Sequence, residues 1–535
     1  MRWQIALSAV LCACLQACGG GGSDASSSQP LPAVDVSTVA AGPTTSALPA
    51  GWQDGVFMEI FVRAYQDSDG DGVGDVRGLI QRLDYLQSLG VKGLWLMPIQ
   101  PSQDGDHGYA VTDYRAVNPS YGTLADFQAL LTQAHQRGIG VVLDYVINHS
   151  AAQHPAFVNA RQGASNPYSD WYVWSTGRPS GWQIYGNTPW HLTQGRYYFG
   201  GFWDQMPDFN LRNDAVVDWH LDNMRFWLNL GVDGFRFDAV GNLVENGPQA
   251  WEHQPENHLI MGRVQQLVAS YDQRFMVCEA PSLPQRYAQS DSCGSAFAFG
   301  YQGDVTAAVK GNADALARLR TYWQDAPEGM VGFVSNHDRF AGERLADQFN
   351  GNVADQKLAS ALYLLQSRRP FIYYGEEIGL RAAALNGDPG LRTPMSWSGQ
   401  SGTAGFTTGR PFRALAANYS TVHVQAQDTD TTSLLAHYRA VIALRNANAP
   451  LATGSYHNID SPSGTLVFER RLGQQRVLVA FNFNAQTTAM NLQGLATSAT
   501  YTHQINTLST PLSTDAQGAV SLNLDGRSFG VWRLD

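Results

Sequence analysis

Eight short apolar runs, each about the length of a β-strand, recur along the chain. They are residues 56–62, 93–98, 140–148, 234–238, 274–279, 295–300, 331–338 and 370–377. Between most of them, apolar residues recur every three to four positions, the spacing of an amphipathic helix, as in residues 124–138, 215–231 and 354–367. Eight strands, most of them followed by a helix, favour a closed barrel over an open sheet. We therefore predict an α/β fold with a (β/α)8 barrel over residues 51–448.

Two parts of the chain depart from this alternation. Roughly 65 residues, rich in Trp, Tyr, Gly and Pro, separate the third predicted strand from its helix, whereas such loops are usually two to six residues long. We interpret residues 149–213 as an inserted domain over the mouth of the barrel. From residue 449 to 535, short segments alternate apolar and polar residues between turns, which predicts a C-terminal antiparallel β-sandwich.

The first 18 residues have the pattern of a secretory signal: one positive charge, an apolar run and then small residues. Their end, Leu15-Gln16-Ala17-Cys18, resembles a bacterial lipoprotein cleavage box, in which Cys18 would carry the lipid. Ordinary secretion with cleavage nearby is the alternative. Residues 19–50 are mostly Gly, Ser, Pro, Ala and Thr without periodicity, which predicts a flexible linker. We expect an exported protein, in the bacterial envelope, the periplasm or the medium, that meets a membrane only through Cys18.

The charge balance argues against a nucleic-acid partner, because the formal net charge is −11 and the chain has no run of Lys or Arg. Aromatic residues make up 11% of the chain, enough for a large core and for the stacking surfaces of a sugar-binding cleft. After Cys18 the only cysteines are Cys278 and Cys293. They form one disulfide in an oxidising compartment, or they remain two free buried thiols.

Polar residues gather where the predicted barrel strands end. They are Asp144, Arg236, Asp238, Glu279, His337 and Asp338. Any one of them could be a helix cap or a turn residue, but all of them together at the C-terminal strand ends indicate an active site. Arg236 and Asp238 point to the same side, since side chains alternate along a strand. A fixed guanidinium there would keep Asp238 ionised and oriented.

A second cluster follows the first predicted strand, in the segment DSDGDGVGD. Its carboxylates Asp67, Asp69, Asp71 and Asp75 are separated mainly by glycines, as in the first part of an EF-hand loop. The alternative is an acidic turn that contacts only water, in which so many neighbouring like charges would have no role. We therefore predict a Ca²⁺ site here.

Together these motifs resemble the α-amylase family of glycoside hydrolases, from about Gly51 to the C-terminus. The matching segments are DYVINH (144–149), GFRFDAV (234–240), the strand end at Glu279, FVSNHD (333–338), MPDFN (206–210), HGYAVTDY (107–114) and YYGEEIG (373–379). Any one of these segments would be weak evidence, but their ordered occurrence at barrel strand ends is strong.

The resemblance implies a role for each residue of the site. Asp238 would be the nucleophile, Glu279 the acid/base and Asp338 the residue that binds sugar hydroxyls and distorts the ring. The two reacting carboxyl groups of a retaining enzyme lie about 5–5.5 Å apart, and Glu279 must hold its proton, so we expect its pKa to be raised. The remaining substrate-binding residues would be Tyr109, stacked on the sugar; His149 and His337, donating to its hydroxyls; and Asp144, orienting Arg236 or the sugar.

The resemblance also extends to the metal. In relatives that cleave oligosaccharides, the backbone carbonyl at Val73 completes the calcium shell, and Asn148 matches one ligand of a second calcium site between the barrel and the inserted domain. Gly241-Asn242 depart from the Lys-His of many α-amylases on the leaving-group side.

The sequence thus predicts a monomeric retaining glycoside hydrolase that cleaves α-1,4-glucosidic bonds of starch or maltooligosaccharides through a covalent intermediate. Two alternatives remain. One is an α-glucosidase or transglycosylase of the same family, and the other is an envelope lipoprotein that only binds glycans.

Overall fold

The computed structural model describes residues 31–505 and 510–534, and in this part of the chain eight strands form one parallel sheet. The order is β10-β9-β8-β7-β3-β2-β1-β11, and a parallel bridge between Gly332 and Pro370 joins the two edges. The (β/α)8 barrel is therefore confirmed. Its strands are β1 (Phe57–Ile60), β2 (Gly93–Leu96), β3 (Gly140–Val146), β7 (Gly234–Asp238), β8 (Phe275–Cys278), β9 (Ala296–Phe297), β10 (Met330–Val331) and β11 (Phe371–Tyr373).

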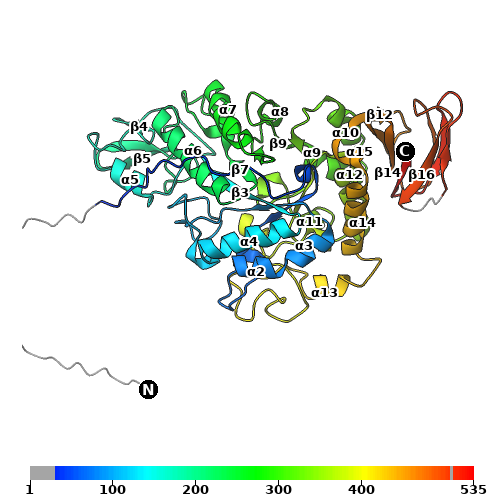
Figure 1. The fold of residues 1–535 in the computed structure, drawn as a ribbon, viewed down its shortest axis with the longest axis horizontal. Coiled ribbons are helices and arrows are strands. Elements are labelled where there is room, and N and C mark those ends of the chain that lie inside the picture. The colour runs from blue at the N-terminus through cyan, green and yellow to red at the C-terminus, as the bar shows by residue number, and fades with distance from the viewer. Residues whose placement is uncertain (1–30, 506–509, 535) are drawn as a thin grey trace, which may run out of the picture.

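Helices connect these strands and cover the sheet (Figure 1). The predicted amphipathic stretches coincide with α4, α6 and α12; α4, for example, buries Phe127, Leu130 and Ala134 on one face and begins at a capping box on Thr123. The helices are α1 (Val62–Tyr65), α2 (Val76–Gln81), α3 (Leu83–Leu89), α4 (Leu124–Gln136), α6 (Asp214–Asn229), α7 (Pro255–Ala269), α8 (Pro284–Tyr287), α9 (Tyr301–Val309), α10 (Ala313–Asp325), α11 (Leu345–Gln348), α12 (Val353–Gln366), α13 (Val424–Gln427), α14 (Leu434–Ala447) and α15 (Ala449–Thr453), with 3-10 turns η1 (Trp52–Asp54), η2 (Pro119–Tyr121), η3 (Val240–Asn242), η4 (Arg339–Ala341), η5 (Glu376–Ile378) and η6 (Asp388–Gly390).

The segment between β3 and α6 folds as a small domain of its own, at the opposite end of the molecule from the C-terminus (Figure 1). It contains α5 (Pro155–Ala160) and a three-stranded antiparallel sheet of β4 (Trp174–Ser175), β5 (Trp190–Thr193) and β6 (Arg196–Phe199). Many of its aromatic residues pack on one another, as Trp182, Trp190 and Phe199 do.

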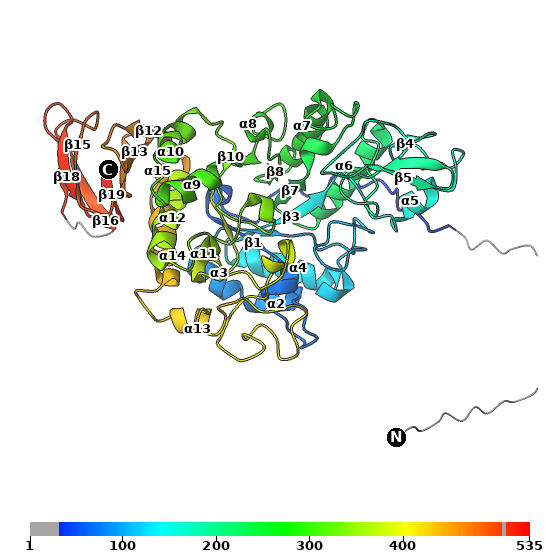
Figure 2. The ribbon, with the colours of Figure 1, turned by 180° about the vertical axis from the view of Figure 1, so that it is seen from behind.

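The C-terminal domain is the predicted antiparallel sandwich. One sheet has the order β12-β13-β14-β19-β16-β17 and the other pairs β15 with β18. Alternate residues of β13 serve two cores: Val467 packs between the sheets, whereas Leu466 and Phe468 join the barrel core. Figure 2 shows this domain beside α10, α12, α14 and α15. Its strands are β12 (Ser455–Ile459), β13 (Thr465–Leu472), β14 (Gln475–Asn482), β15 (Thr488–Leu492), β16 (Thr500–Ile505), β17 (Leu512–Ser513), β18 (Val520–Leu524) and β19 (Ser528–Leu534).

The described part of the expected linker, residues 31–50, is not a free tether. It has no helix or strand before residue 50, but it contacts Asp222 on α6 of the barrel and Asn159 in the inserted domain. Two side-chain donors and one backbone amide donate hydrogen bonds to its carbonyl groups, which explains why a Gly-poor, Pro-containing stretch stays in place. The bonds are Asn159 Nδ2 to Pro32 O (2.8 Å), Trp219 Nε1 to Asp35 O (2.8 Å) and Asp272 N to Thr44 O (2.8 Å).

The expected signal, Cys18 and residues 19–30 lie outside the described residues. Among the helices that are described, none has both the length and the apolar character needed to cross a bilayer.

Cys278 and Cys293 form a disulfide, which resolves the open question about these thiols. The bond joins the end of β8 to the segment before β9, and Glu279 follows Cys278 directly.

Candidate active site

The polar residues of the strand ends meet in and beneath one cavity of about 720 Å³. Tyr109, His149, Asp238, Glu279 and Asp338 line the cavity. The other predicted site residues, Asp144, Arg236 and His337, lie below it and are at most 1% exposed. The structure thus brings all eight predicted catalytic and substrate-binding residues together.

Arg236 is the centre of the charge network. Its Nη1 contacts Asp144 Oδ1 at 2.9 Å and Asp238 Oδ1 at 2.7 Å, and its Nη2 contacts Glu279 Oε2 at 2.9 Å. The two nitrogens of one guanidinium thus hold Asp238 and Glu279 next to each other, as a retaining pair of carboxyl groups requires. Asp144 contacts Arg236, in agreement with the first of its two predicted roles, which was to orient Arg236.

Burial raises the pKa of Asp238 and of Glu279. The pKa of Asp238 rises to about 6, because burial and the charge of Asp144 outweigh Arg236. The pKa of Glu279 rises to about 7, through burial and the neighbouring charges of Asp238 and Asp338, which confirms the expected direction. Of the two, Glu279 therefore holds its proton more readily and Asp238 loses it more readily.

His337 lies deeper than the sequence suggested. It is 0% exposed, its Nδ1 contacts Glu59 Oε1 at 2.6 Å and its Nε2 contacts Tyr109 Oη at 2.7 Å. Both ring nitrogens are occupied, so this structure does not present His337 to a sugar hydroxyl. Burial alone would lower its pKa, but Asp338 and Glu59 raise the pKa of His337 to about 10.

The imidazolium acts on Asp338 instead. His337 Nε2 lies 3.1 Å from Asp338 Oδ2, and Arg392 Nη2 lies 2.7 Å from its Oδ1. These two cations outweigh burial and hold the pKa of Asp338 well below its usual range. Asp338 therefore stays ionised when its neighbour Glu279 is protonated.

Tyr109 and His149 line the cavity as expected, with different surroundings. The Tyr109 hydroxyl donates to Asp144 Oδ2 (2.9 Å), and its ring stacks on His337 at 5.6 Å while the residue lines the cavity. Burial lowers the pKa of His149 to about 4, so its imidazole is neutral. Its Nε2 has no partner among the described residues.

Three residues of the network were missed in the sequence: Glu59, Trp95 and Arg392. Trp95 Nε1 donates to Asp144 Oδ2 at 3.1 Å. Glu59 had a readable signal, a carboxylate inside an otherwise apolar predicted strand. Arg392 had none, since it lies in a long irregular segment after β11.

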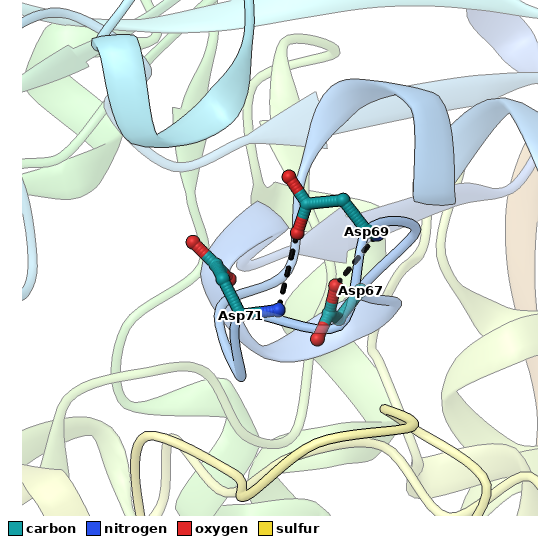
Figure 3. A group of neighbouring side chains, drawn as sticks. All are labelled: Asp67, Asp69 and Asp71. Carbon is teal, nitrogen blue, oxygen red and sulfur yellow. Dashed lines mark hydrogen bonds between the residues drawn. The ribbon is translucent and has the colours of Figure 1, made fainter.

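The acidic loop after β1 gathers three of its four carboxylates (Figure 3). One oxygen of each of Asp67, Asp69 and Asp71 lies within 4.8 Å of the others, and Asp69 and Asp71 are exposed. Asp67 is buried but accepts hydrogen bonds from Thr407, Gly70 and Gly72, which outweigh burial and lower its pKa. This set of carboxyl oxygens fits a hard cation such as Ca²⁺.

The other two predicted ligands of this loop, Asp75 and the carbonyl of Val73, are not part of the close group of carboxylates. Asp75 caps α2, accepting from Gly78 N at 2.8 Å. The amide of Val73 donates to Asp71 Oδ1 at 2.7 Å, which holds the turn that carries its carbonyl group.

Asn148, the predicted ligand of a second site, has buried acidic neighbours that sequence reasoning did not find. Its Nδ2 donates to Asp208 Oδ2 at 2.9 Å, and Asp208 also interacts with Glu245. Asn148 Oδ1 and Glu245 Oε1 are buried without a partner in the described part of the chain. Asp208 belongs to the motif MPDFN, which was the available signal.

Comparison with known proteins gives one consistent result. The family model described as the catalytic domain of alpha amylase matches residues 59–454. An oligo-1,6-glucosidase of Parageobacillus thermoglucosidasius is 31% identical, over 82% of this chain and 92% of that protein. An alpha-amylase of Dictyoglomus thermophilum is also 31% identical, over 81% and 85%.

Among solved structures, an alpha-glucosyl transfer enzyme superposes with a TM-score of 0.77 at 30% identity, covering 90% of this chain and 99% of that one. The similarity therefore extends over the barrel and beyond it, and the enzymes that share it differ in reaction.

Proposed function

The chain belongs to the α-amylase family of glycoside hydrolases, and on this basis we propose that it cleaves α-1,4-glucosidic bonds of starch or maltooligosaccharides with retention of configuration. The observation that carries the proposal is the pair Asp238 and Glu279, side by side on Arg236 at the wall of one open cavity. A cavity of about 720 Å³ has room for more than one sugar ring.

The geometry supports double displacement. Asp238, as the carboxylate, attacks the anomeric carbon while Glu279 gives its proton to the leaving oxygen, so that the glycosidic bond breaks as the ester forms. Glu279, now ionised, takes a proton from water, which attacks the same carbon and releases Asp238. Asp338 remains charged throughout and is placed to bind hydroxyls of the distorted sugar.

The pH dependence of kcat/KM follows from these two carboxyls. Asp238 must be ionised, and its pKa of about 6 predicts an activity that falls as pH drops through that value. Glu279 must be protonated, and its pKa of about 7 predicts a fall as pH rises through that value. We therefore expect a narrow bell with its maximum between them, since each limb reports the coupled pair. Rates on a chromogenic maltooligosaccharide from pH 4 to 9 check it, and a flat profile across pH 6 to 8 would contradict it.

A second candidate is an α-glucosidase or transglycosylase, which the similarity to an oligo-1,6-glucosidase and to a glucosyl transfer enzyme favours. Product analysis on amylose, pullulan and maltotriose separates the candidates. An α-1,4 endo-hydrolase cuts end-blocked maltooligosaccharides and shortens amylose, an α-glucosidase releases only glucose from free ends, and a transglycosylase forms longer products from maltotriose. A protein that only binds glycans releases nothing.

We propose that Asp67, Asp69, Asp71 and the carbonyl of Val73 hold Ca²⁺, which would neutralise the like charges of the loop. Calcium at 100 times its Kd would stabilise the fold by about 2.7 kcal/mol. Chelation is expected to lower the Tm by a few degrees, and Asp71→Asn should reduce that shift because it removes one ligand. Asp84→Asn, an exposed aspartate outside the loop, is the control. If metal analysis shows that chelation has removed the calcium and the Tm is nevertheless unchanged, the site is refuted.

Asn148, Asp208 and Glu245 are the proposed ligands of the second, less complete calcium site.

We also propose that the protein is exported as a monomer, with Cys18 as its lipid anchor. Metabolic labelling with a fatty acid, lost in Cys18→Ser, tests the anchor.

A further inference from the structure

Three non-glycine residues that line the cavity have a left-handed backbone: Tyr185 (φ 49°), Ala239 (φ 48°) and His253 (φ 53°). Such residues are strained and persist where the surrounding structure fixes them, which makes them indicators of function. Ala239 directly follows Asp238 and donates its amide to Glu279 Oε2 at 3.2 Å. Tyr185 and His253 have no part in the mechanism above.

Tyr185 reaches the cavity from the inserted domain, at a turn closed by Ile184 and Asn187. Its ring centroid lies 6.0 Å from that of Phe202 and 5.6 Å from that of Trp251, yet 64% of the residue is exposed. Its hydroxyl bonds to Asn242; burial and the nearby charges of Glu252 and Glu279 raise the pKa of Tyr185 to about 12. Through Trp251, the exposed ring lies beside the segment that follows Asp238, and that segment contacts Glu279 at the amide of Ala239.

His253 lies in the segment between η3 and α7, two residues after Trp251, which the Tyr185 ring contacts. Its amide donates to Gly241 O at 2.7 Å, and its ring packs on Gly241 so closely that a Cβ there would lie 2.9 Å from His253 Cε1. The backbone of Gly241 is not left-handed, so glycine is needed at this position for space and not for conformation. The turn after the nucleophile is thus fitted to the imidazole of His253.

The polar groups of this wall have a definite chemistry. Asn242, Glu252 and His253 line the cavity with Pro281 and Ser282, and burial lowers the pKa of His253, so that its ring is neutral near pH 7. The cation that lines the cavity, Arg392, is bound to Asp338. An amide, a carboxylate and a neutral imidazole bind hydroxyl groups, whereas the carboxylate repels a phosphate.

We propose that Tyr185, Glu252 and His253 form the subsite for the sugar on the leaving-group side of the scissile bond, and that it accepts an uncharged glucosyl unit and rejects a phosphorylated one. The position beside Glu279 defines the side, because Glu279 protonates the leaving oxygen. The ring of Tyr185 offers a stacking face, and Glu252 with His253 offers partners for hydroxyls. This inference rests on the glycosidase function proposed above.

The test compares two substrates that differ only on this side. α-Maltosyl fluoride carries no leaving sugar, whereas maltotriose cleaved into maltose and glucose transfers the same maltosyl unit and releases a sugar. For Tyr185→Ala and His253→Ala, the ratio of kcat/KM on maltotriose to kcat/KM on the fluoride is expected to fall by about 10- to 100-fold. Gly241→Ala should lower the ratio in the same direction, since its methyl group displaces the His253 ring. His457→Ala, on β12 of the C-terminal domain, is the matched control and should leave the ratio unchanged.

The outcomes are distinct. A wild-type protein that cleaves neither the fluoride nor maltotriose overturns the proposed function itself. A wild-type protein that cleaves both, with variants whose ratio is unchanged, overturns the subsite. Tyr185→Phe, which removes only the bond to Asn242, and a Tm measurement of every variant separate a local effect from misfolding.

A separate experiment tests whether the subsite prefers an uncharged sugar to a phosphorylated one. With α-glucosyl fluoride as donor, glucose and glucose 6-phosphate are offered as acceptors to the wild-type protein, and transfer products are counted. Transfer to glucose at least tenfold above transfer to glucose 6-phosphate is expected, and Glu252→Gln should narrow the difference. Equal transfer to both acceptors would contradict the proposed selectivity.

Discussion

Asp238→Asn is expected to lower kcat on maltotriose on the order of 10⁴-fold or more, because an amide cannot form the glycosyl ester. The fold should tolerate the change. Arg236 keeps its contacts with Asp144 and Glu279, and the amide has nearly the shape of the carboxylate. The measurements are steady-state rates, Tm and the Kd for maltotriose by calorimetry. Turnover should collapse while Tm and Kd stay close to those of the wild-type protein.

Asp314→Asn is the matched control, since Asp314 is an exposed aspartate in the first turn of α10. A further measurement identifies the role of Asp238. In Asp238→Ala, azide can enter from the face that the carboxylate leaves free, so that rescue should yield the β-glycosyl azide by a single displacement. Wild-type turnover by the Asn variant, or an azide product of α configuration, would remove Asp238 from the role of nucleophile.

Glu279→Gln is expected to lower kcat on maltotriose by about 10²- to 10⁴-fold, because the amide cannot protonate the leaving oxygen. The loss should be much smaller for formation of the glycosyl ester from α-glucosyl fluoride, since fluoride leaves without a proton. The basic limb of the pH profile should also disappear, because it reports the raised pKa of Glu279. Burst and steady-state rates on both substrates across pH 5 to 9 provide the check.

Glu328→Gln, an exposed glutamate before β10, controls for the change in charge. With Glu279→Ala, azide should attack the glycosyl ester from the leaving-group face and give the α-glycosyl azide, opposite in configuration to the Asp238 product. Equal losses on maltotriose and on the fluoride would show that Glu279 supports the site without transferring the proton.

The sequence predicted the site well wherever local pattern carries the information. Asp238 and Glu279 end apolar strands that are neighbours in the barrel, and parallel strands place their C-terminal ends at one rim. The alternation along β7 placed Arg236 and Asp238 on one face, and the 2.7 Å contact between them agrees with it.

The prediction was weaker where a role depends on what lies beneath a residue. His337 was expected to face the sugar, but Glu59, from a strand far away in sequence, binds one of its nitrogens from below. Arg392 binds Asp338 from an irregular segment whose path no periodicity describes. Residues 31–50 looked like a linker by composition, yet carbonyl groups there are captured by side chains more than a hundred residues away.

By itself, the sequence determined the barrel, the inserted and C-terminal domains, and the residue types at the rim, because strand and helix periods are local properties of a chain. Only the tertiary structure decided which of those residues are open to a substrate and which are held below it, how one guanidinium joins three carboxyls, and that Tyr185 and His253, from two distant loops, line the same cavity. Burial and proximity set the protonation of these groups, and both depend on segments that meet only after folding.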